Sequence, residues 1–172
     1  RGRQGVFLLV LSTLMLPVQA TIVPLYIIFV RFGWIGSIKP LVVPLFFGDA
    51  FTIFLLRQFF LTIPEDLSDA ARVDGASEFQ IMTRVIVPLA KPAIAAVALF
   101  QFLYSWNDFL SPLLYLVENP DQWTLSIALS EFESQFHVQW NLTMAASVLF
   151  MVPVIVLFFL AQKHFIKGIT MG

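Results

Sequence analysis

Two aspartates stand inside long apolar segments, where an ionised carboxylate could bind a proton, a cation or a hydroxyl-bearing solute. Asp49 lies in the middle of residues 40–61, which also carry Arg57 near their end, and Asp108 is the only charged residue of 92–117. If these segments cross a membrane, an Asp at mid-helix costs about 2.5–3.5 kcal/mol on insertion scales. Each carboxylate therefore needs a hydrogen-bonding partner or a water-filled cavity.

The residues before Asp108 form a polar patch in an otherwise apolar segment. They are Tyr104, Ser105, Trp106 and Asn107. Aromatic rings can stack on sugar faces, and Asn and Asp can hydrogen-bond hydroxyl groups. One interpretation is that this patch and Asp49 line a solute route, and the other is an interhelical hydrogen-bond network that only holds the helices together. For Asp49 the second is favoured, because Gly48 and Thr52 beside it indicate close packing.

The patterns of common catalytic and cofactor sites are absent from the sequence. It contains no Cys, which excludes disulfides, a catalytic thiol and thiolate metal ligands. It has no Gly-x-x-x-x-Gly-Lys-Ser/Thr loop for nucleotide phosphates. A formal net charge of −1 provides no electrostatic footprint for nucleic acid. We expect no catalytic residue, no metal site and no cofactor bound by this chain.

The composition identifies the elements that must hold these residues. Hydrophobic residues make up 59% of the 172 residues and charged residues 12%, whereas a soluble domain averages roughly 45–50% and about 25%. A soluble globule of this size could not bury so much apolar surface, and disorder requires low hydrophobicity. The sequence therefore predicts an all-α integral membrane protein.

Four apolar segments are long enough to cross a bilayer, which takes roughly 20 helical residues. They are 6–30, 40–61, 92–117 and 142–162. Pro17, Pro24 and Pro153 lie inside the first and last of them and are tolerated where neighbouring groups satisfy the freed backbone atoms. The sequence predicts a bundle of kinked transmembrane helices, with 1–172 as a single membrane domain.

Basic residues are distributed unequally between the two sets of span ends. One set carries eight of the ten Lys and Arg residues; it consists of the N-terminus, residues 57–91 and the C-terminal tail. The other set, residues 31–39 and 118–141, carries the remaining two. The positive-inside rule therefore predicts that both termini of this chain and residues 62–91 are cytoplasmic.

The segment 62–91 is predicted to form two short helices joined by a turn. Residues 62–65 and 77–80 resemble capping boxes that begin the two helices. Gly75 between them indicates a sharp turn, because glycine adopts positive φ at little cost. Pro88 is expected to end the second helix. By periodicity alone, this segment is a solvated amphipathic linker on the membrane surface.

A longer pattern in this segment resembles the coupling motif of ATP-binding-cassette (ABC) importer permeases. That motif reads Glu-Ala-Ala, three residues, Gly, nine residues, then Ile-x-Leu-Pro. Here the matching residues are Asp69-Ala70-Ala71, then Asp74 within the three-residue gap, Gly75, and Val85-Ile86-Val87-Pro88. The spacing agrees throughout, and the departures are conservative: Asp for Glu, and Val for Ile and for Leu.

Other stretches resemble the permease subgroup that imports carbohydrates and related polyols, of the maltose and glycerol-3-phosphate type. They are Pro17 with Pro24-Leu25-Tyr26, residues 71–76, Trp106-Asn107-Asp108 and Gly168-Ile169-Thr170-Met171-Gly172. That subgroup usually has six spans, and the resemblance implies that the four expected here are its last four. The chain therefore resembles the C-terminal two-thirds of a permease subunit.

The resemblance implies a type I importer permease of a bacterial inner membrane that forms half of a translocation pathway. A coupling helix would dock on a cytoplasmic ATPase, which would use ATP and Mg, and small residues would allow close approach. Other implied partners are a second permease subunit, an extracytoplasmic solute-binding protein and the lipid bilayer. The expected coupling residues are Asp69, Ala70, Ala71, Asp74, Gly75, Val85 and Pro88. The expected pathway residues are Tyr104, Trp106, Asn107, Asp108 and Asp49.

Two other functions would use the aspartates directly. A secondary transporter or channel would use Asp49 or Asp108 as a proton or cation site, but it does not explain the pattern over 69–88. An intramembrane aspartyl protease would carry Tyr-Asp in one span and Gly-x-Gly-Asp in the next. Here Asn107 precedes one aspartate and Phe47-Gly48 the other, so the protease signatures are absent.

Overall fold

The computed structural model describes residues 2–131, 133–134, 137–138 and 140–169. The expectations that concern Arg1 and residues 170–172, namely the extreme termini and most of the 168–172 resemblance, fall outside the described residues. The described chain is almost entirely helical, with one short antiparallel pair of strands. The predicted all-α class is confirmed.

The elements in chain order are as follows. They are α1 (Arg3–Ser12), the 3₁₀ turn η1 (Thr13–Met15), α2 (Val18–Arg31), α3 (Lys39–Val42), η2 (Val43–Phe47), α4 (Ala50–Phe60), α5 (Glu65–Val73), α6 (Glu78–Ile81), the π-helical turn η3 (Met82–Ile86), α7 (Val87–Leu89), α8 (Lys91–Trp106), α9 (Leu110–Leu116), η4 (Pro120–Gln122), α10 (Leu125–Glu131), β1 (Glu133–Ser134), β2 (His137–Val138) and α11 (Trp140–Ile169).

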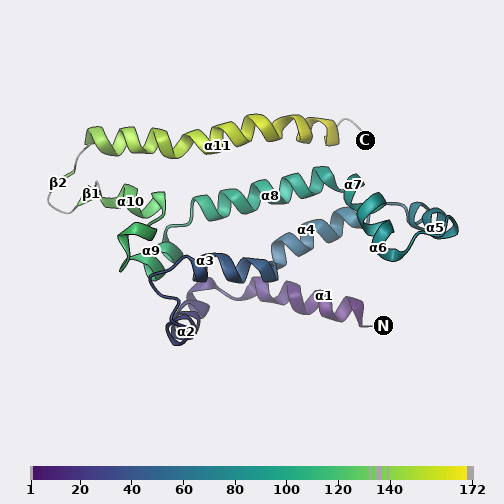
Figure 1. The fold of residues 1–172 in the computed structure, drawn as a ribbon, viewed down its shortest axis with the longest axis horizontal. Coiled ribbons are helices and arrows are strands. Elements are labelled where there is room, and N and C mark those ends of the chain that lie inside the picture. Colours follow the sequence, from purple (N-terminus) through teal and green to yellow (C-terminus); the bar gives the residue numbers. More distant parts are fainter. Residues whose placement is uncertain (1, 132, 135–136, 139, 170–172) are drawn as a thin grey trace.

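The helices α1, α4, α8 and α11 run side by side and form the body of the molecule (Figure 1). α8 packs against both α11 and α4, and α4 packs against α1. The rings of Phe51 and Phe100 meet edge to face between α4 and α8 at 6.2 Å, and Phe7 and Phe54 stack between α1 and α4 at 6.5 Å. The start of α1, the α5–α6 pair and the end of α11 lie at one end of this body, opposite α9 and α10.

The first expected span, 6–30, is not one helix. The α1–η1 stretch and α2 meet at an angle of 96°. Leu16 has φ −78° and ψ 118°, outside the helical region, and Pro17 follows as the N-cap of α2. A residue before proline is disfavoured in the α region, and proline has no N–H to continue the helix. The kink expected at Pro17 is therefore a complete break, whereas Pro24 stays inside α2.

Two further breaks fall beside the aspartates. Gly48, with φ 76°, and Asp49 separate η2 from α4. Residues 107–109 separate α8 from α9, so the expected third span, 92–117, is divided between these two helices. At its other end α8 begins at Lys91 and makes an angle of 73° with the preceding stretch, Glu78–Leu89.

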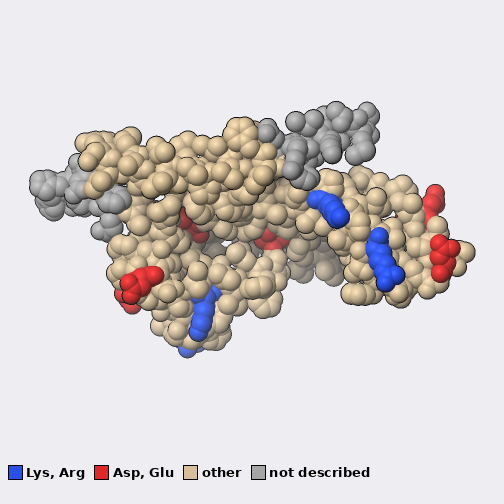
Figure 2. All heavy atoms as spheres, turned by 45° about the horizontal axis from the view of Figure 1, so that its top comes forward, with Lys and Arg blue, Asp and Glu red and all other residues tan. Residues whose placement is uncertain are grey.

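Two stretches of the described chain, Lys39–Phe60 and Trp140–Ala161, have the length and apolar composition to cross a membrane. The number reaches the expected four only when each bent pair, α1–α2 and Glu78–Leu89 with α8, counts as one span. Trp140–Ala161 carries no Lys, Arg, Asp or Glu, and Figure 2 shows a long uncharged surface along it; most of the charged side chains in this view lie toward the two ends of the molecule, and a few acidic atoms show between them.

Most of the buried apolar residues gather at the end formed by α2, α9 and α10, whereas Ile81 and Ala90 lie at the other end. Phe29, Tyr115, Leu116 and Ile127 are at most 6% exposed. Phe29 meets the Tyr115 ring edge to face at 5.3 Å, and Gly36 N donates to Tyr115 O at 2.7 Å. Most large apolar side chains of the described α11 are exposed instead, as a surface that contacts lipid or other subunits requires.

Candidate functional site

A short loop connects α4 to α5, and the N-terminal cap of α5 differs from the predicted one. Pro64 is the N-cap of α5, and no side chain caps this helix. Thr62 donates its hydroxyl backward to Phe59 O at 2.7 Å. The capping box expected at 62–65 is therefore wrong, because the Thr hydroxyl bonds the last turn of α4 rather than the first turn of α5.

α5 ends in a sharp reversal at Gly75, whose φ is 82°. Gly75 N donates to Arg72 O at 3.0 Å, and the next N–H donates to Ala71 O at 3.0 Å, the two bonds of a Schellman C-cap. Gln80 N then donates to Ser77 Oγ at 3.4 Å, and Ser77 N donates to Gln80 Oε1 at 2.9 Å. The predicted turn and the second capping box are confirmed.

Arg72 joins α5 to α6 across this turn. Its Nη1 donates to Asp69 Oδ1 at 2.6 Å, and its Nε and Nη2 donate to Glu78 Oε1 and Oε2 at 2.7 and 3.2 Å. Hydrogen bonds to Glu78 and then Asp69 raise the pKa of Arg72 above its usual value, and the same contact lowers the pKa of Glu78. The sequence prediction omitted Arg72 and Glu78. The spacing of Asp69 and Arg72 was a signal, but the Glu78 contact depends on the reversal.

The predicted coupling residues divide into two groups along this segment. Asp69, Ala70, Ala71, Asp74 and Gly75 lie on α5 and its turn, whereas Val85 lies in η3 and Pro88 in α7. Beside the first group, Val73 and Phe79 are 88% and 76% exposed. Large apolar side chains left in water indicate a contact surface for a partner. Neither belongs to the spacing pattern, and the sequence prediction omitted both.

The second group lies where the segment turns toward α8. Pro88 has no N–H to donate to the Arg84 carbonyl, and the helix widens to a π turn over Met82–Ile86. Ala90, between α7 and α8, is fully buried. This packed bend connects the α5–α6 pair directly to α8, the central helix of the body.

A cavity of about 890 Å³ lies among η1, α2, α4 and α8. Its polar lining residues are Thr13, Thr21, Asp49, Thr52, Gln101 and Tyr104. A second cavity, of about 290 Å³, is lined by Ser105, Asp108, Ser111, Tyr115 and Thr124 among others, and Tyr104 borders both. A concave, mostly apolar site with a few hydroxyl, amide and carboxylate groups is suited to binding a small polar solute.

Both aspartates accept hydrogen bonds at helix N-termini. Asp49 Oδ1 accepts from Thr52 N at 2.9 Å at the start of α4, and Asp108 Oδ1 accepts from Ser111 N at 3.1 Å at the start of α9. The free N–H groups and the helix dipole there stabilise a negative charge. The partner that each apolar segment required is therefore the backbone of the following helix.

The other two residues of the polar patch lie away from the cavities. Trp106 Nε1 donates to Phe150 O at 3.1 Å, and its ring lies 5.4 Å from the rings of Phe102 and Phe150. Trp106 therefore joins α8 to α11. Asn107 Nδ2 donates back to Leu103 O at 2.7 Å. A direct solute contact for these two residues stays a prediction.

The alternative of a proton- or cation-coupled transporter would use Asp49 or Asp108 as its site, and the cavities that the structure describes do not bring these two carboxylates together. Each of the two aspartates lines a different cavity. In the part of the chain that the structure describes, no three His, Asp or Glu side chains are grouped so as to hold a metal ion.

Known proteins match this chain over nearly its whole length. Residues 1–171 match the family of binding-protein-dependent transport system inner membrane components. The chain is 38% identical over 172 residues to the arabinooligosaccharides transport system permease protein AraQ of Bacillus subtilis, which covers 100% of this chain and 60% of the relative. It is 37% identical over 170 residues to the sn-glycerol-3-phosphate transport system permease protein UgpE of Agrobacterium fabrum, covering 98% and 60%.

A solved structure shares the fold. It is the structure of a bacterial ABC transporter involved in the import of the acidic polysaccharide alginate, and it matches with a TM-score of 0.81 and 26% identity over 96% of this chain and 62% of that chain. The chain thus spans 60% of the length of both relatives named above. With the coupling pattern over 69–88, these matches show that the chain belongs to the family of binding-protein-dependent transport system inner membrane components, the permeases of ABC importers.

Proposed function

We propose that this chain is the C-terminal part of the permease subunit of an ATP-driven importer, and that α5–α6 docks it onto the ATPase. The observation that carries this proposal is the α5–α6 pair itself. Its turn at Gly75 is fixed by two backbone bonds, Arg72 ties its two helices together, and Val73 and Phe79 are exposed beside the turn. A rigid projecting element of this kind transmits motion as a body.

The proposed solute is an oligosaccharide, a sugar or a related polyol. Support comes from the two relatives, whose names specify arabinooligosaccharides and sn-glycerol-3-phosphate, and from the hydroxyl, amide and carboxylate groups around the larger cavity. Asp49 and Tyr104 are the residues of the proposed route that border this cavity, and Asp108 borders the smaller one.

The proposed assembly contains a second permease subunit, ATPase subunits and an extracytoplasmic solute-binding protein in a bacterial inner membrane. ATP and Mg are used by the ATPase, since this sequence has no phosphate-binding loop. The basic residues of the N-terminus and of 57–91 favour an orientation with α5–α6 and both termini of this chain in the cytoplasm.

A photo-crosslinking amino acid at Val73 tests the docking proposal in the intact transporter. Val73 is 88% exposed beside the α5–α6 turn, and Val117, 49% exposed after α9 at the opposite end, is the matched control. We expect the probe at Val73 to crosslink to the ATPase subunit and the probe at Val117 not to do so.

Uptake by the same variants discriminates between the energy sources. ATP depletion should abolish solute uptake, whereas collapse of the proton gradient at constant ATP should leave the uptake rate unchanged. Equal crosslinking from both positions, or uptake that follows the proton gradient, would contradict the proposed function.

A further inference from the structure

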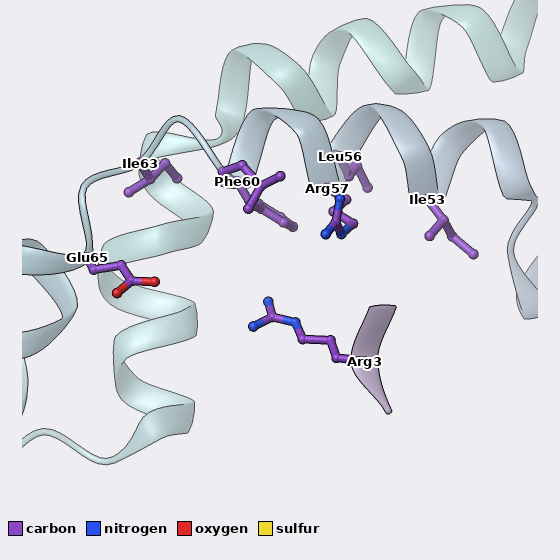
Figure 3. A pocket seen from close by; sticks show the side chains of 8 residues that line it. Arg3, Ile53, Leu56, Arg57, Phe60, Ile63 and Glu65 are labelled. Atoms are coloured by element: carbon purple, nitrogen blue, oxygen red, sulfur yellow. The ribbon is translucent and has the colours of Figure 1, made fainter. Parts of the chain in front are cut away.

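A separate cavity of about 420 Å³ lies between the start of α1 and the C-terminal half of α4 (Figure 3). It is at the end of the molecule that carries α5–α6. Arg3 reaches into it from α1, Arg57 borders it from α4, and Glu65 faces it from the start of α5. None of these residues belongs to the coupling pattern or to the solute-facing cavities.

The two arginines of this cavity have no ionic partner among the described residues. Within the described residues, neither Arg3 nor Arg57 has a carboxylate within 4.0 Å, in contrast to Arg72, which has two. The guanidinium carbon of Arg57 lies 4.0 Å from the centroid of the Phe7 ring, which in turn stacks on Phe54. An aromatic ring occupies only the face of a guanidinium. Its N–H edge can therefore donate to an oxyanion.

Apart from Arg57, the wall that α4 contributes to the cavity is apolar. Ile53, Leu56 and Phe60 follow one another at helical spacing along α4 and line it from inside the predicted span toward its end. A ligand that satisfies both parts of the cavity needs an anionic group near the arginines and a hydrocarbon chain along α4. The three ionisable side chains sum to a charge of +1, which matches one phosphodiester.

We propose that this cavity binds an anionic phospholipid of the phosphatidylglycerol type. Its phosphodiester lies between Arg3 and Arg57, an acyl chain lies along Ile53, Leu56 and Phe60, and Glu65 accepts hydrogen bonds from the headgroup hydroxyls. Arginine suits this role because its planar group donates two parallel hydrogen bonds to phosphate oxygens. Basic pockets between membrane helices on the cytoplasmic side are sites where anionic headgroups bind.

The proposal has a structural consequence. α1 and α4 contact each other through Phe7 and Phe54 near this cavity. A lipid phosphate shared by Arg3 and Arg57 adds a second bridge between the same helices, next to the start of α5. The lipid therefore stabilises the base from which the α5–α6 pair projects.

Lipid retention by the intact transporter tests this site. The complex is reconstituted with phosphatidylglycerol and phosphatidylcholine, extracted in detergent and examined by native mass spectrometry. Arg3→Gln is the main variant, because the Arg3 side chain makes no hydrogen bond or ion pair within the described residues and its replacement should leave the fold intact. Arg84→Gln removes an exposed arginine of the same end outside the cavity and is the matched control.

We expect the wild-type complex to retain phosphatidylglycerol in preference to phosphatidylcholine. Arg3→Gln should retain roughly fivefold less, Arg3→Gln with Arg57→Gln less still, and Arg84→Gln as much as the wild type. An excess of inorganic phosphate should not displace the lipid, because the acyl chain contributes to binding.

Three results would overturn the proposal. The first is that the wild type and both cavity variants retain the same amount of phosphatidylglycerol. The second is that Arg84→Gln loses as much of this lipid as Arg3→Gln does. The third is that the wild type retains phosphatidylcholine as well as phosphatidylglycerol. Displacement of the lipid by inorganic phosphate would identify a site for free phosphate instead, and this too would contradict a lipid site.

Discussion

Asp49 and Asp108 each occupy the start of a helix within an otherwise apolar region. The first N–H groups of a helix have no partner in the helix and carry a partial positive charge. One carboxylate oxygen of each residue accepts such an N–H. Within the described residues the other oxygen, Oδ2, accepts no hydrogen bond, so it remains available to water or to a solute in the adjoining cavity.

Asp108→Asn separates the charge of this residue from its hydrogen bond to Ser111 N in the first turn of α9. Asn caps a helix about as well as Asp, so α9 should remain in place and the transporter should assemble. If the carboxylate contacts the solute, uptake should fall roughly tenfold or more, because hydrogen bonds to charged groups contribute about 1.5–3 kcal/mol. The uptake rate and the yield of the assembled complex are the two measurements.

Asp108→Ala is the control for this experiment, since it removes the hydrogen bond to Ser111 N as well and should destabilise the start of α9 by about 1 kcal/mol. Wild-type uptake by Asp108→Asn would show that the charge is not part of the solute route. Loss of the complex in Asp108→Asn would show that Asp108 holds the helices together instead.

Glu78→Gln tests the link between α5 and α6. It keeps the size of the side chain and removes the charge that pairs with Arg72. We expect a broader distance distribution between spin labels at Asp66 and Met82, and less uptake per ATP hydrolysed. Glu118→Gln, which changes an exposed acid at the opposite end of the molecule without an ion pair in the described residues, should change neither.

The same link should depend on pH. Arg72 lowers the pKa of Glu78 below its ordinary value of 4.5. The stabilisation is therefore fully present above pH 4.5 and is lost as the pH falls through the lower folded-state value. Acidification into that range should broaden the distances in the wild type and not in Glu78→Gln. An equal response of both proteins would assign the broadening to other groups.

At the scale of elements, the α5–α6 turn depends on the backbone of Gly75. Its φ is 82°, and a Cβ built there would meet no atom within 4 Å. A substitution is therefore disfavoured by the backbone conformation, by about 1–3 kcal/mol for a β-branched residue, rather than by a clash. Coupling of ATP hydrolysis to uptake should decrease in the order Gly75→Asn, Gly75→Ala, Gly75→Val, because Asn tolerates this region best.

Membrane insertion of all three variants should be normal, since the predicted spans are unchanged. Complex yield, ATPase activity and uptake are measured together to distinguish failed docking from uncoupling. Wild-type uptake in Gly75→Val would show that this turn is not the mechanical link and that the segment is a surface linker.

The elements that the sequence predicts well are those specified by local chemistry. Gly75 and the Ser77 capping box act within a few residues, and both form as expected. The break at Pro17 is harder to predict, because a proline in a membrane helix can be accommodated as a kink or end the helix, and packing decides between them. The breaks beside Asp49 and Asp108 have a local signal, because each acid lies three residues before the N–H that donates to it. The apolar length of the two segments, however, favoured spans that continue through these positions.

The contacts of Arg72 with Glu78 and of Trp106 with α11 required the tertiary structure. Glu78 is six residues from Arg72, and only the reversal between them brings the two charges together. A tryptophan is a residue type that often stacks on sugars, so the residue type of Trp106 alone suggested a solute contact. Its hydrogen bond to Phe150 O, 44 residues away, could not be inferred from spacing. Residue type and spacing therefore predict the coupling segment better than they predict the lining of the cavities.

At the scale of the whole molecule, the ends of the body differ in character. The start of α1, α5–α6 and the end of α11 share one end, and the loops around α9 and α10 form the other. Trp34 and Trp123 lie near this second end; Trp123 Nε1 donates to Leu116 O at 3.1 Å, and Trp34 stacks on Phe29 at 5.6 Å. Rings of this kind suit a membrane interface.

Cysteine labelling in intact cells tests the proposed orientation of these ends. The chain has no Cys, so a single introduced thiol reports without background. Met82→Cys places it at an exposed position of η3, and Val117→Cys at an exposed position after α9. Ser77 is unsuitable, because it caps α6. A membrane-impermeant maleimide should label Val117→Cys from outside and leave Met82→Cys unlabelled until the cells are opened, because the basic end stays in the cytoplasm. Labelling of Met82→Cys from outside would reverse the orientation, and α5–α6 could then not dock on a cytoplasmic ATPase.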